Sequence, residues 1–148
     1  MIVLRTLSKA LGLAAIRLGY MVSCKDIINI INRVKSPYNL NAISQYIGVM
    51  ALKNKDKIYK YVEEVKIERD YLYEELIQMP LQVYQSDANF IFFKSDVDGL
   101  EKALEKEGIL IRSFSGDLEG YYRVTVGSRW ENEEFIKSLK GILKNENI

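Results

Sequence analysis

The fold of this chain is decided by residues 4–20, LRTLSKALGLAAIRLGY. Residues 2–4 form a short apolar run that is typical of a buried strand, and the alternation in residues 16–22 predicts a second strand. The small residues between them, 10–15, can turn the chain. The pattern therefore predicts two strands joined by a short connection.

Three chemically distinct side chains are expected to converge at this connection: Ser8, Lys9 and Arg17. Strand alternation places Arg17 on the face opposite the apolar residues. The turn in the chain then brings Arg17 back near Ser8 and Lys9. A lysine amine condenses with an aldehyde, while a hydroxyl and a fork-shaped guanidinium bind a phosphate. The trio suits pyridoxal phosphate. The alternative, a surface lysine and an arginine in a routine ion pair, stays open on these residues alone.

Composition limits the classes of protein to consider. The 148 residues are 48% hydrophobic and 28% charged, enough to bury one core or two small ones in a soluble protein. The 21 basic and 20 acidic residues give a net charge of +1, so neither a nucleic acid nor a membrane partner is expected. Charged residues interrupt the first apolar run, which predicts no targeting segment and favours a cytoplasmic location.

Two residue counts exclude further chemistry. The chain has no histidine, which excludes a Ser-His triad and a histidine-dependent metal site, so lysine has to carry any proton transfer. The single Cys24 cannot form an intramolecular disulfide or, by itself, a thiolate zinc site. We interpret Cys24 as structural and expect no metal.

Two helices are predicted after the strands. Residues 23–26, SCKD, have the form of a capping box, and the apolar spacing that follows predicts a helix that ends before Pro37. Asn39 or Asn41 can cap a second helix that ends among residues 53–55. We expect these two helices to cover the strands.

The clearest helical pattern spans residues 56–78. Its apolar residues follow steps of three and four, and the standard rise makes such a helix about 30 Å long. A helix of this length can bridge two subdomains, which is the interpretation we favour. A coiled-coil arm is the alternative, but fewer than four apolar heptads are present and tyrosines crowd the flanks.

Beyond Pro80 the sequence alternates between short strands and helices. The predicted strands are residues 81–84, 89–94, 109–112 and 121–126. One helix is expected to begin at Asp96 and to end at a left-handed Gly108, and residues 128–131, SRWE, form a capping box that opens the last helix. Residues 79–148 are therefore expected to form an α+β unit with helices packed on a small sheet.

Two arginines stand out in this α+β unit. Arg112 ends one predicted strand, and Arg123 interrupts an apolar one. A strand holds a guanidinium rigidly enough to bind a carboxylate or phosphate with two parallel hydrogen bonds. The alternative is that each arginine pairs with a structural acid such as Asp117 or Glu119.

Several of these segments resemble one known family. Residues 4–20 closely resemble the cofactor-lysine segment of fold-type I aminotransferases, particularly histidinol-phosphate aminotransferases. Residues 108–112, GILIR, and 122–127, YRVTVG, resemble the end of the small domain in the same family, and residues 86–90, SDANF, resemble its Ala-Asn-Phe strand entry. The similarity therefore extends over both ends of the chain.

The resemblance implies an α/β fold that is the C-terminal part of a fold-type I pyridoxal-phosphate-dependent transferase. Residues 1–55 would be a remnant of the cofactor-binding large domain, 56–78 a bridging helix and 79–148 the small α+β domain. It implies Lys9 as the catalytic lysine that binds pyridoxal 5'-phosphate covalently and moves protons. The other implied site residues are Ser8, Arg17 and, more weakly, Thr6 on the cofactor phosphate, with Arg123 and Arg112 on the substrate.

The implied reaction is a transamination in a homodimeric enzyme of histidine biosynthesis. Histidinol phosphate and 2-oxoglutarate would give imidazole-acetol phosphate and glutamate, so the partner is a small amino or keto acid or a phosphorylated substrate. A threonine-phosphate decarboxylase on the same scaffold is one alternative, and a non-enzymatic interaction module is another.

One departure from the family concerns the residues that precede Lys9. A complete member is roughly twice as long, and its preceding portion supplies a phosphate loop, a ring stacked on the cofactor and an aspartate on the pyridine nitrogen. None of these motifs stands upstream of Lys9. We therefore expect a truncated chain that is inactive, or nearly so, by itself.

Overall fold

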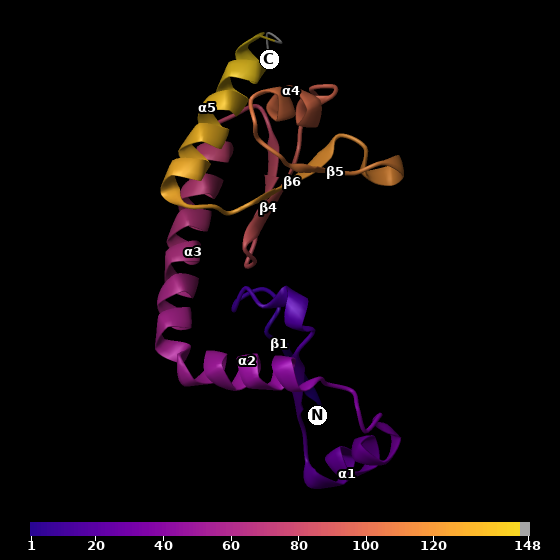
Figure 1. The fold of residues 1–148 in the computed structure, drawn as a ribbon. Coiled ribbons are helices and arrows are strands. Elements are labelled where there is room, and N and C mark those ends of the chain that lie inside the picture. The colour runs from indigo at the N-terminus through magenta and orange to yellow at the C-terminus, as the bar shows by residue number, and fades with distance from the viewer. Residues whose placement is uncertain (146–148) are drawn as a thin grey trace. The chain divides into compact units, whose positions relative to one another are not determined.

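The computed structural model describes residues 1–145 and divides the chain into two compact units. Unit 1 is Met1–Val62 and unit 2 is Glu63–Ile148. The division falls inside the long helix α3, Lys55–Leu76, which lies within two residues of the helix predicted from residues 56–78 (Figure 1). Each unit is considered by itself.

Unit 1 begins with a two-stranded antiparallel ladder. Strand β1, Val3–Thr6, pairs with β2, Gly19–Val22, in a register that sets Thr6 opposite Gly19. The short 3-10 helix η1, Ala14–Ile16, lies in the connection. The two predicted strands and their short connection are therefore confirmed, although β2 begins three residues later than expected.

The helices of unit 1 are α1, Lys25–Val34, and α2, Ala42–Lys53. The predicted cap of α2 is confirmed, because the Asn41 side chain accepts a hydrogen bond of 2.8 Å from the Ser44 amide. Gly48 of α2 has no side chain because Leu18 packs directly over it: a Cβ at this position would clash with the Leu18 Cδ2. This close approach holds α2 against the connection between the strands.

Three expectations for unit 1 are wrong. β1 is mostly exposed rather than buried, and α1 contains no buried residue, so α1 does not cover the strands. The buried residues of unit 1 are Leu7, Ser44 and Gly48. The SCKD segment makes no capping box, because the Ser23 hydroxyl donates to the Met1 carbonyl, 2.8 Å away, and Cys24 occupies the N-cap.

Unit 2 contains a four-stranded antiparallel sheet. The strands are β3, Gln82–Tyr84; β4, Phe90–Lys94; β5, Arg112–Ser113; and β6, Tyr121–Thr125. Their order in the sheet is β3-β4-β6-β5. The helices are α4, Leu100–Lys106, and α5, Arg129–Asn145, with a 3-10 turn η2, Gly116–Leu118.

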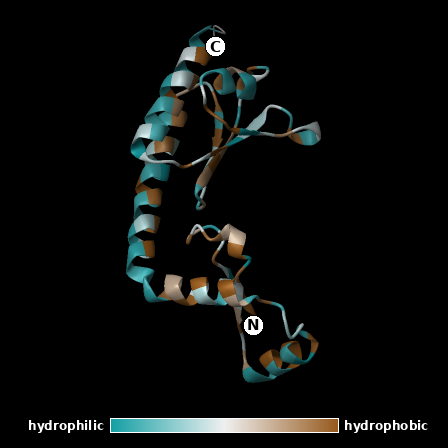
Figure 2. Ribbon diagram, viewed as in Figure 1, coloured by the Kyte–Doolittle hydropathy of each residue, from teal (hydrophilic) through white to brown (hydrophobic). Residues whose placement is uncertain are grey.

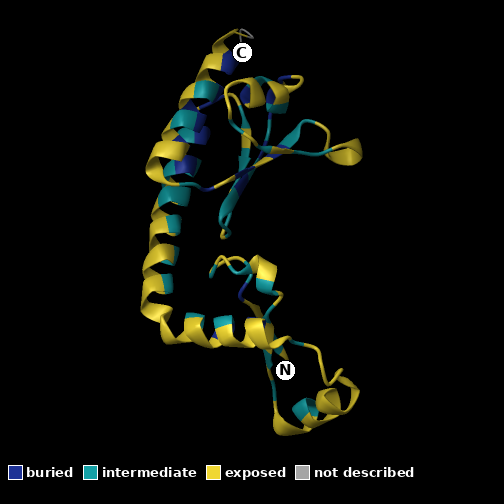
Figure 3. Cartoon of the chain, viewed as in Figure 1, coloured by how far each residue is buried: buried dark blue, intermediate teal, exposed yellow. Residues whose placement is uncertain are grey.

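The core of unit 2 lies between one face of this sheet and the helices α3, α4 and α5. Alternate strand residues Ile91, Phe93, Tyr122 and Val124 face this core, where they meet Leu72, Leu104 and Leu139 from the three helices. Apolar and buried residues gather along the facing sides of α3, α5 and the sheet (Figures 2 and 3). The predicted α+β arrangement is confirmed. The other face of the sheet, called the open face below, carries Tyr84, Phe90, Phe92, Lys94, Arg112, Tyr121, Arg123 and Thr125.

Two predictions in unit 2 are wrong at the ends of elements. Asp96 does not cap α4, which begins at Leu100 after Gly99 in a left-handed conformation with φ of 66°. Residues 109–111 form no strand, because Ile109 donates to the Leu104 carbonyl as α4 ends and pairing with β6 begins only at Arg112. The left-handed Gly108, with φ of 81°, is confirmed.

The start of α5 is fixed by a polar network around Asn132, which is 3% exposed. The Asn132 side chain accepts from the Gly127 amide at 3.0 Å and donates to the Gly127 carbonyl at 3.2 Å. It also donates to Glu68 of α3, which pairs with Arg129 at 3.1 Å. One buried amide therefore joins the turn after β6 to two helices.

The predicted capping box at residues 128–131 is confirmed. The backbone N–H and the hydroxyl of Ser128 both donate to Glu131 Oε2, at 2.7 Å each. The hydroxyl, followed by the backbone N–H, holds the pKa of Glu131 below its usual range. The ionised carboxylate is therefore the form that closes the turn.

We expect Asn132→Ala to lower the free energy of unfolding by about 2 kcal/mol, because the Gly127 amide and carbonyl lose their partners in a buried turn. Chemical denaturation measures this loss. Glu75→Gln is the matched control, because it removes another α3–α5 link, the exposed Glu75–Lys140 pair of 2.8 Å, and should cost no more than about 1 kcal/mol. Equal losses for the two variants would contradict the account.

Glu131 should make stability depend on pH on the acid side. A carboxylate whose pKa is lowered on folding stabilises the fold above its unfolded pKa, and this contribution disappears as pH falls through the folded pKa. The difference in unfolding free energy between wild type and Glu131→Gln should therefore shrink on acidification. Glu133→Gln, at an exposed position of the same helix, is the control. A difference that stays constant down to acid pH would show that the hydrogen bonds do not favour the carboxylate.

Candidate functional site

The lysine segment follows directly from β1. Thr6 ends the strand, and its Oγ1 accepts a hydrogen bond of 3.1 Å from the Ser8 amide while its hydroxyl donates to Ser8 Oγ at 2.9 Å. Lys9 is exposed, and its carbonyl accepts from the Gly12 amide at 2.9 Å, which closes the turn. Two hydroxyls therefore lie together beside an exposed amine.

Arg17 lies at the other end of the connection, in an unusual conformation. With φ of 53° and ψ of 37° it is the one non-glycine residue with positive φ in the part of the chain that the structure describes. Arg17 does not lie in the second strand, which corrects the expected alternation. Its guanidinium donates to the Ala14 carbonyl at 3.2 Å. A left-handed arginine costs free energy that an ordinary surface residue has no reason to retain.

The structure brings the two ends of this segment together through the backbone. Leu7 donates to the Leu18 carbonyl at 3.1 Å, immediately beyond the Thr6–Gly19 pair. The predicted return of the chain is thus present. Among residues 1–145, no hydrogen bond joins Arg17 to Ser8 or Lys9, and neither Lys9 nor Arg17 is in an ion pair with an acid.

A pocket of about 460 Å³ lies next to the lysine segment within unit 1. Thr6 and Leu7 line it together with two cations, Arg5 and Lys55, and the ring of Tyr20. Ser8, Lys9 and Arg17 are not among its lining residues. Of the expected cofactor residues, only Thr6 therefore faces this pocket.

The two units differ strongly in charge, a feature that the total of +1 conceals. Unit 1 contains ten lysines and arginines against two acids, a formal charge of +8, whereas residues 63–148 contain eleven against eighteen, a formal charge of −7. No ion pair within 4.0 Å involves a unit 1 side chain in the described structure. Counting charges by half of the chain would have revealed this difference from the sequence. Unit 1 favours anionic ligands over cationic ones.

Arg112 and Arg123 meet on the open face of the unit 2 sheet. The antiparallel pairing of β5 with β6 sets them directly opposite each other, and both side chains are exposed. Neither is in an ion pair in the described part of the chain, so the suggested acids Asp117 and Glu119 do not neutralise them. Two like charges in this position are destabilising without an anion.

Each of these arginines lies over an aromatic ring that sequence reasoning missed. The Arg123 Cζ is 5.1 Å from the centre of the Phe90 ring, and the Arg112 Cζ is 5.9 Å from that of Phe114. Both distances fall within the range of cation–π attraction. Strand alternation alone does not show that Phe90 lies near Arg123, because neighbours on different strands depend on a register that the sequence does not reveal.

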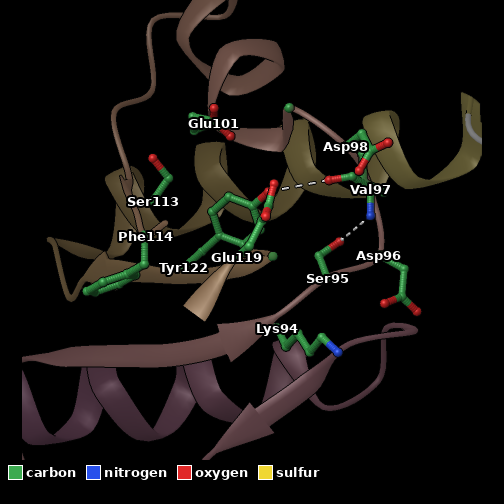
Figure 4. Close-up of a pocket in the computed structure, with 12 residues that line it drawn as sticks. Lys94, Ser95, Asp96, Val97, Asp98, Glu101, Ser113, Phe114, Glu119 and Tyr122 are labelled. Atoms are coloured by element: carbon green, nitrogen blue, oxygen red, sulfur yellow. Dashed lines mark hydrogen bonds between the residues drawn. The ribbon is translucent and has the colours of Figure 1, made fainter. Parts of the chain in front are cut away.

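A pocket of about 360 Å³ lies in unit 2 where β4 ends (Figure 4). Asp96, Asp98, Glu101 and Glu119 line it, and the hydroxyl of the buried Tyr122 donates to the Val97 carbonyl at 3.4 Å. Burial, followed by the charge of Glu101, raises the pKa of Tyr122. The acidic lining repels phosphates and carboxylates, so anionic substrates are better accommodated by the two arginines.

The described residues contain neither a metal-binding cluster nor a helix suited to crossing a membrane. No group of three or more histidine, cysteine, aspartate or glutamate side chains is arranged to hold a metal ion there. None of the described helices combines the length and the apolar character that crossing a membrane requires.

Comparison with known sequences connects this geometry to a family. The family model for aminotransferase class I and II matches residues 1–139. The histidinol-phosphate aminotransferase of Pyrococcus furiosus is 40% identical over 144 residues, which are 97% of this chain and 41% of that protein. The chain therefore spans about two-fifths of the length of the curated relatives it matches.

Solved structures give the same result for the fold. The histidinol-phosphate aminotransferase of Clostridium acetobutylicum has a TM-score of 0.82 at 27% identity, over 97% of this chain and 46% of that one. L-threonine-O-3-phosphate decarboxylase from Porphyromonas gingivalis has a TM-score of 0.82 at 24% identity over the same shares. The Sinorhizobium meliloti histidinol-phosphate aminotransferase in complex with pyridoxal-5'-phosphate has a TM-score of 0.78 at 21% identity, over 98% of this chain and 41% of that one. At these identities the last two show the fold alone.

The left-handed conformation of Arg17 should be visible in stability. Arg17→Gly and Arg17→Ala both remove the guanidinium, but only alanine keeps the conformational penalty, so the glycine variant should be more stable by about 1 kcal/mol. Hydrogen exchange of the Leu7 amide, which is bonded to Leu18, measures this difference. Asn29 of the helix α1 is the control position. There the alanine variant should be more stable than the glycine variant, because alanine favours a helix and glycine does not. Equal protection for the two Arg17 variants would show that the residue is not strained.

Proposed function

The chain belongs to the class I and II aminotransferases, and we propose that it carries the cofactor lysine and the substrate arginines of a pyridoxal-phosphate-dependent histidinol-phosphate transaminase. Such an enzyme moves the amino group of histidinol phosphate to 2-oxoglutarate and forms imidazole-acetol phosphate and glutamate. The observation that carries the proposal is the exposed Lys9 beside paired hydroxyls, in a segment that keeps Arg17 strained and unpaired with any acid.

The donors of the lysine segment fit the phosphate of pyridoxal phosphate. Thr6 and Ser8 present hydroxyls 2.9 Å apart, and the guanidinium of Arg17 can offer two parallel N–H groups to phosphate oxygens. No carboxylate in the described structure competes for Arg17 within ion-pair distance. We therefore assign Ser8 and Arg17, with Thr6 as a supporting donor, to the cofactor phosphate.

Lys9 is assigned to the aldehyde end of the cofactor and to proton transfer. Its exposed amine is the nucleophile that binds the cofactor covalently at rest. Pyridoxal phosphate, when bound, supplies the electron-withdrawing ring that makes the α-proton of an amino substrate acidic. The Lys9 Nζ would then take that proton and return it as the general base.

Arg123 is assigned to the carboxylate of the amino or keto acid substrate, and Arg112 to a supporting role beside it. Both arginines lie on strands, where their backbone positions are fixed by pairing, and neither is in an ion pair in the described part of the chain. An anion between them would also relieve the repulsion between the two guanidinium groups.

The domain division, the location and the oligomeric state that we propose rest on the similarity to the aminotransferases. Residues 1–55 would belong to the cofactor-binding large domain, 56–78 to a bridging helix and 79–148 to the small domain of a cytoplasmic homodimer that acts on small molecules. The decarboxylation of threonine phosphate is the second candidate, because the Porphyromonas gingivalis structure has the same fold over 97% of this chain. The products separate the two reactions: transamination yields glutamate, and decarboxylation releases carbon dioxide.

We expect pyridoxal phosphate to label Lys9 selectively. After brief exposure to the aldehyde and borohydride reduction, peptide mass spectrometry should find Lys9 modified several-fold more than Lys25, an exposed lysine of the same unit. Pyridoxal, which lacks the phosphate, should show little preference for Lys9. The difference between the two aldehydes measures how strongly the phosphate is held.

The double variant Ser8→Ala, Arg17→Gln should remove the advantage of pyridoxal phosphate over pyridoxal at Lys9 without changing the labelling of Lys25. Lys9→Ala should abolish the preferred label. Equal labelling of Lys9 and Lys25 in the wild type, or a preference that survives the double variant, would overturn the assignment of these residues to the cofactor.

A further inference from the structure

Arg112 and Arg123 repel each other, yet no acid among residues 1–145 lies within ion-pair distance of either. Their opposition is imposed by the pairing of β5 with β6, and Phe92 stands opposite Arg123 on the other side, in β4. A side chain that is exposed and repelled by its neighbour would ordinarily sample many rotamers, which weakens the binding of any ligand. Something other than an ion pair has to limit this freedom.

The rings beneath the two guanidinium groups are themselves fixed. Phe114, under Arg112, meets Phe92 edge to face with ring centres 5.6 Å apart. Phe92 in turn stacks on Tyr121, at 5.3 Å and 16°, and contacts Tyr84 at 5.5 Å. Phe90, under Arg123, is partly buried and lies on the same strand as Phe92. The open face therefore carries a connected aromatic layer of Tyr84, Phe92, Phe114 and Tyr121, and Phe90 lies two residues before Phe92 on the same face of β4.

An aromatic support differs from an acidic one in what it leaves free. A carboxylate would neutralise the guanidinium and occupy its N–H groups, so that a ligand would have to displace it. A ring attracts the flat face of the cation and leaves the N–H groups at its rim available for a carboxylate. We propose that Phe90 and Phe114 are positioning residues that hold Arg123 and Arg112 ready for an anionic substrate. The proposal rests on the function assigned to these arginines.

The placement can be tested without any ligand in the full 148-residue chain. In nuclear magnetic resonance spectra, a ring below the guanidinium shifts the arginine Hε resonance upfield. Phe90→Leu should remove this shift from Arg123 and leave that of Arg112 in place, whereas Phe114→Leu should do the reverse. Phe90→Tyr, which restores a ring, should restore the shift of Arg123.

Binding is tested by titration of the same variants with 2-oxoglutarate. Phe90→Leu should weaken binding by about two- to fivefold, which corresponds to a cation–π contribution of about 0.5–1 kcal/mol at an exposed site. Phe90→Tyr should recover the affinity. Tyr84→Leu is the matched control, because it removes a ring of the same layer that contacts Phe92 and no arginine. It should leave the affinity within twofold of wild type.

The inference and the proposed function fail in different ways. If Phe90→Leu leaves both the Arg123 resonance and the affinity unchanged, or if Tyr84→Leu weakens binding equally, the positioning role is wrong. If the wild type shows the ring-dependent shifts but binds no 2-oxoglutarate, the substrate role of the arginines is wrong while the placement by the rings is established.

Discussion

The register between β5 and β6 forces two guanidinium groups to face each other across neighbouring strands. That register is maintained by the opposite face of the same strands, where Tyr122 and Val124 pack into the core with residues of α3, α4 and α5. Shifting a strand by one residue would bury the arginines, so the core does not permit the repulsion to be relieved in this way. An anion between the two side chains relieves it without any change of fold, and aromatic rings leave room for that anion.

Unit 1 also contains cations that no acid neutralises among the described residues. Arg17 is held in a left-handed conformation, and the formal charge of +8 finds no internal acid within ion-pair distance among the described residues. The proposed function gives these features a common interpretation, because the phosphate of the cofactor and the carboxylate of the substrate would both be anions. Under the proposed function, a bound anion would supply the charge that balances the cations of each unit, none of which except Arg69, Arg129, Lys66, Lys137 and Lys140 is in an ion pair among the described residues.

Sequence patterns predicted the helices well because capping and periodicity are local. Asn41 and the box at residues 128–131 behave as expected, whereas the box at 23–26 failed because Ser23 found a partner 22 residues away, the Met1 carbonyl. Strand ends were predicted less accurately, since pairing decides where β2 and β5 begin. The candidate residues were singled out by their chemistry and strand positions, and a family resemblance supplied their roles. Phe90 could not be found as a support of Arg123, because neighbours on different strands depend on register. Phe114 lies two residues after Arg112, so strand alternation could have indicated it.

The central claim is that Arg112 and Arg123 repel each other until an anion binds, and a double-mutant cycle measures this directly. The free energy of unfolding is determined for wild type, Arg112→Gln, Arg123→Gln and the double variant, with and without saturating 2-oxoglutarate. Without the ligand, the coupling energy should be repulsive by about 0.2–1 kcal/mol, as for like charges directly opposite in a sheet. With the ligand its sign should reverse. A coupling near zero in both conditions, or an attractive one without ligand, would contradict the account.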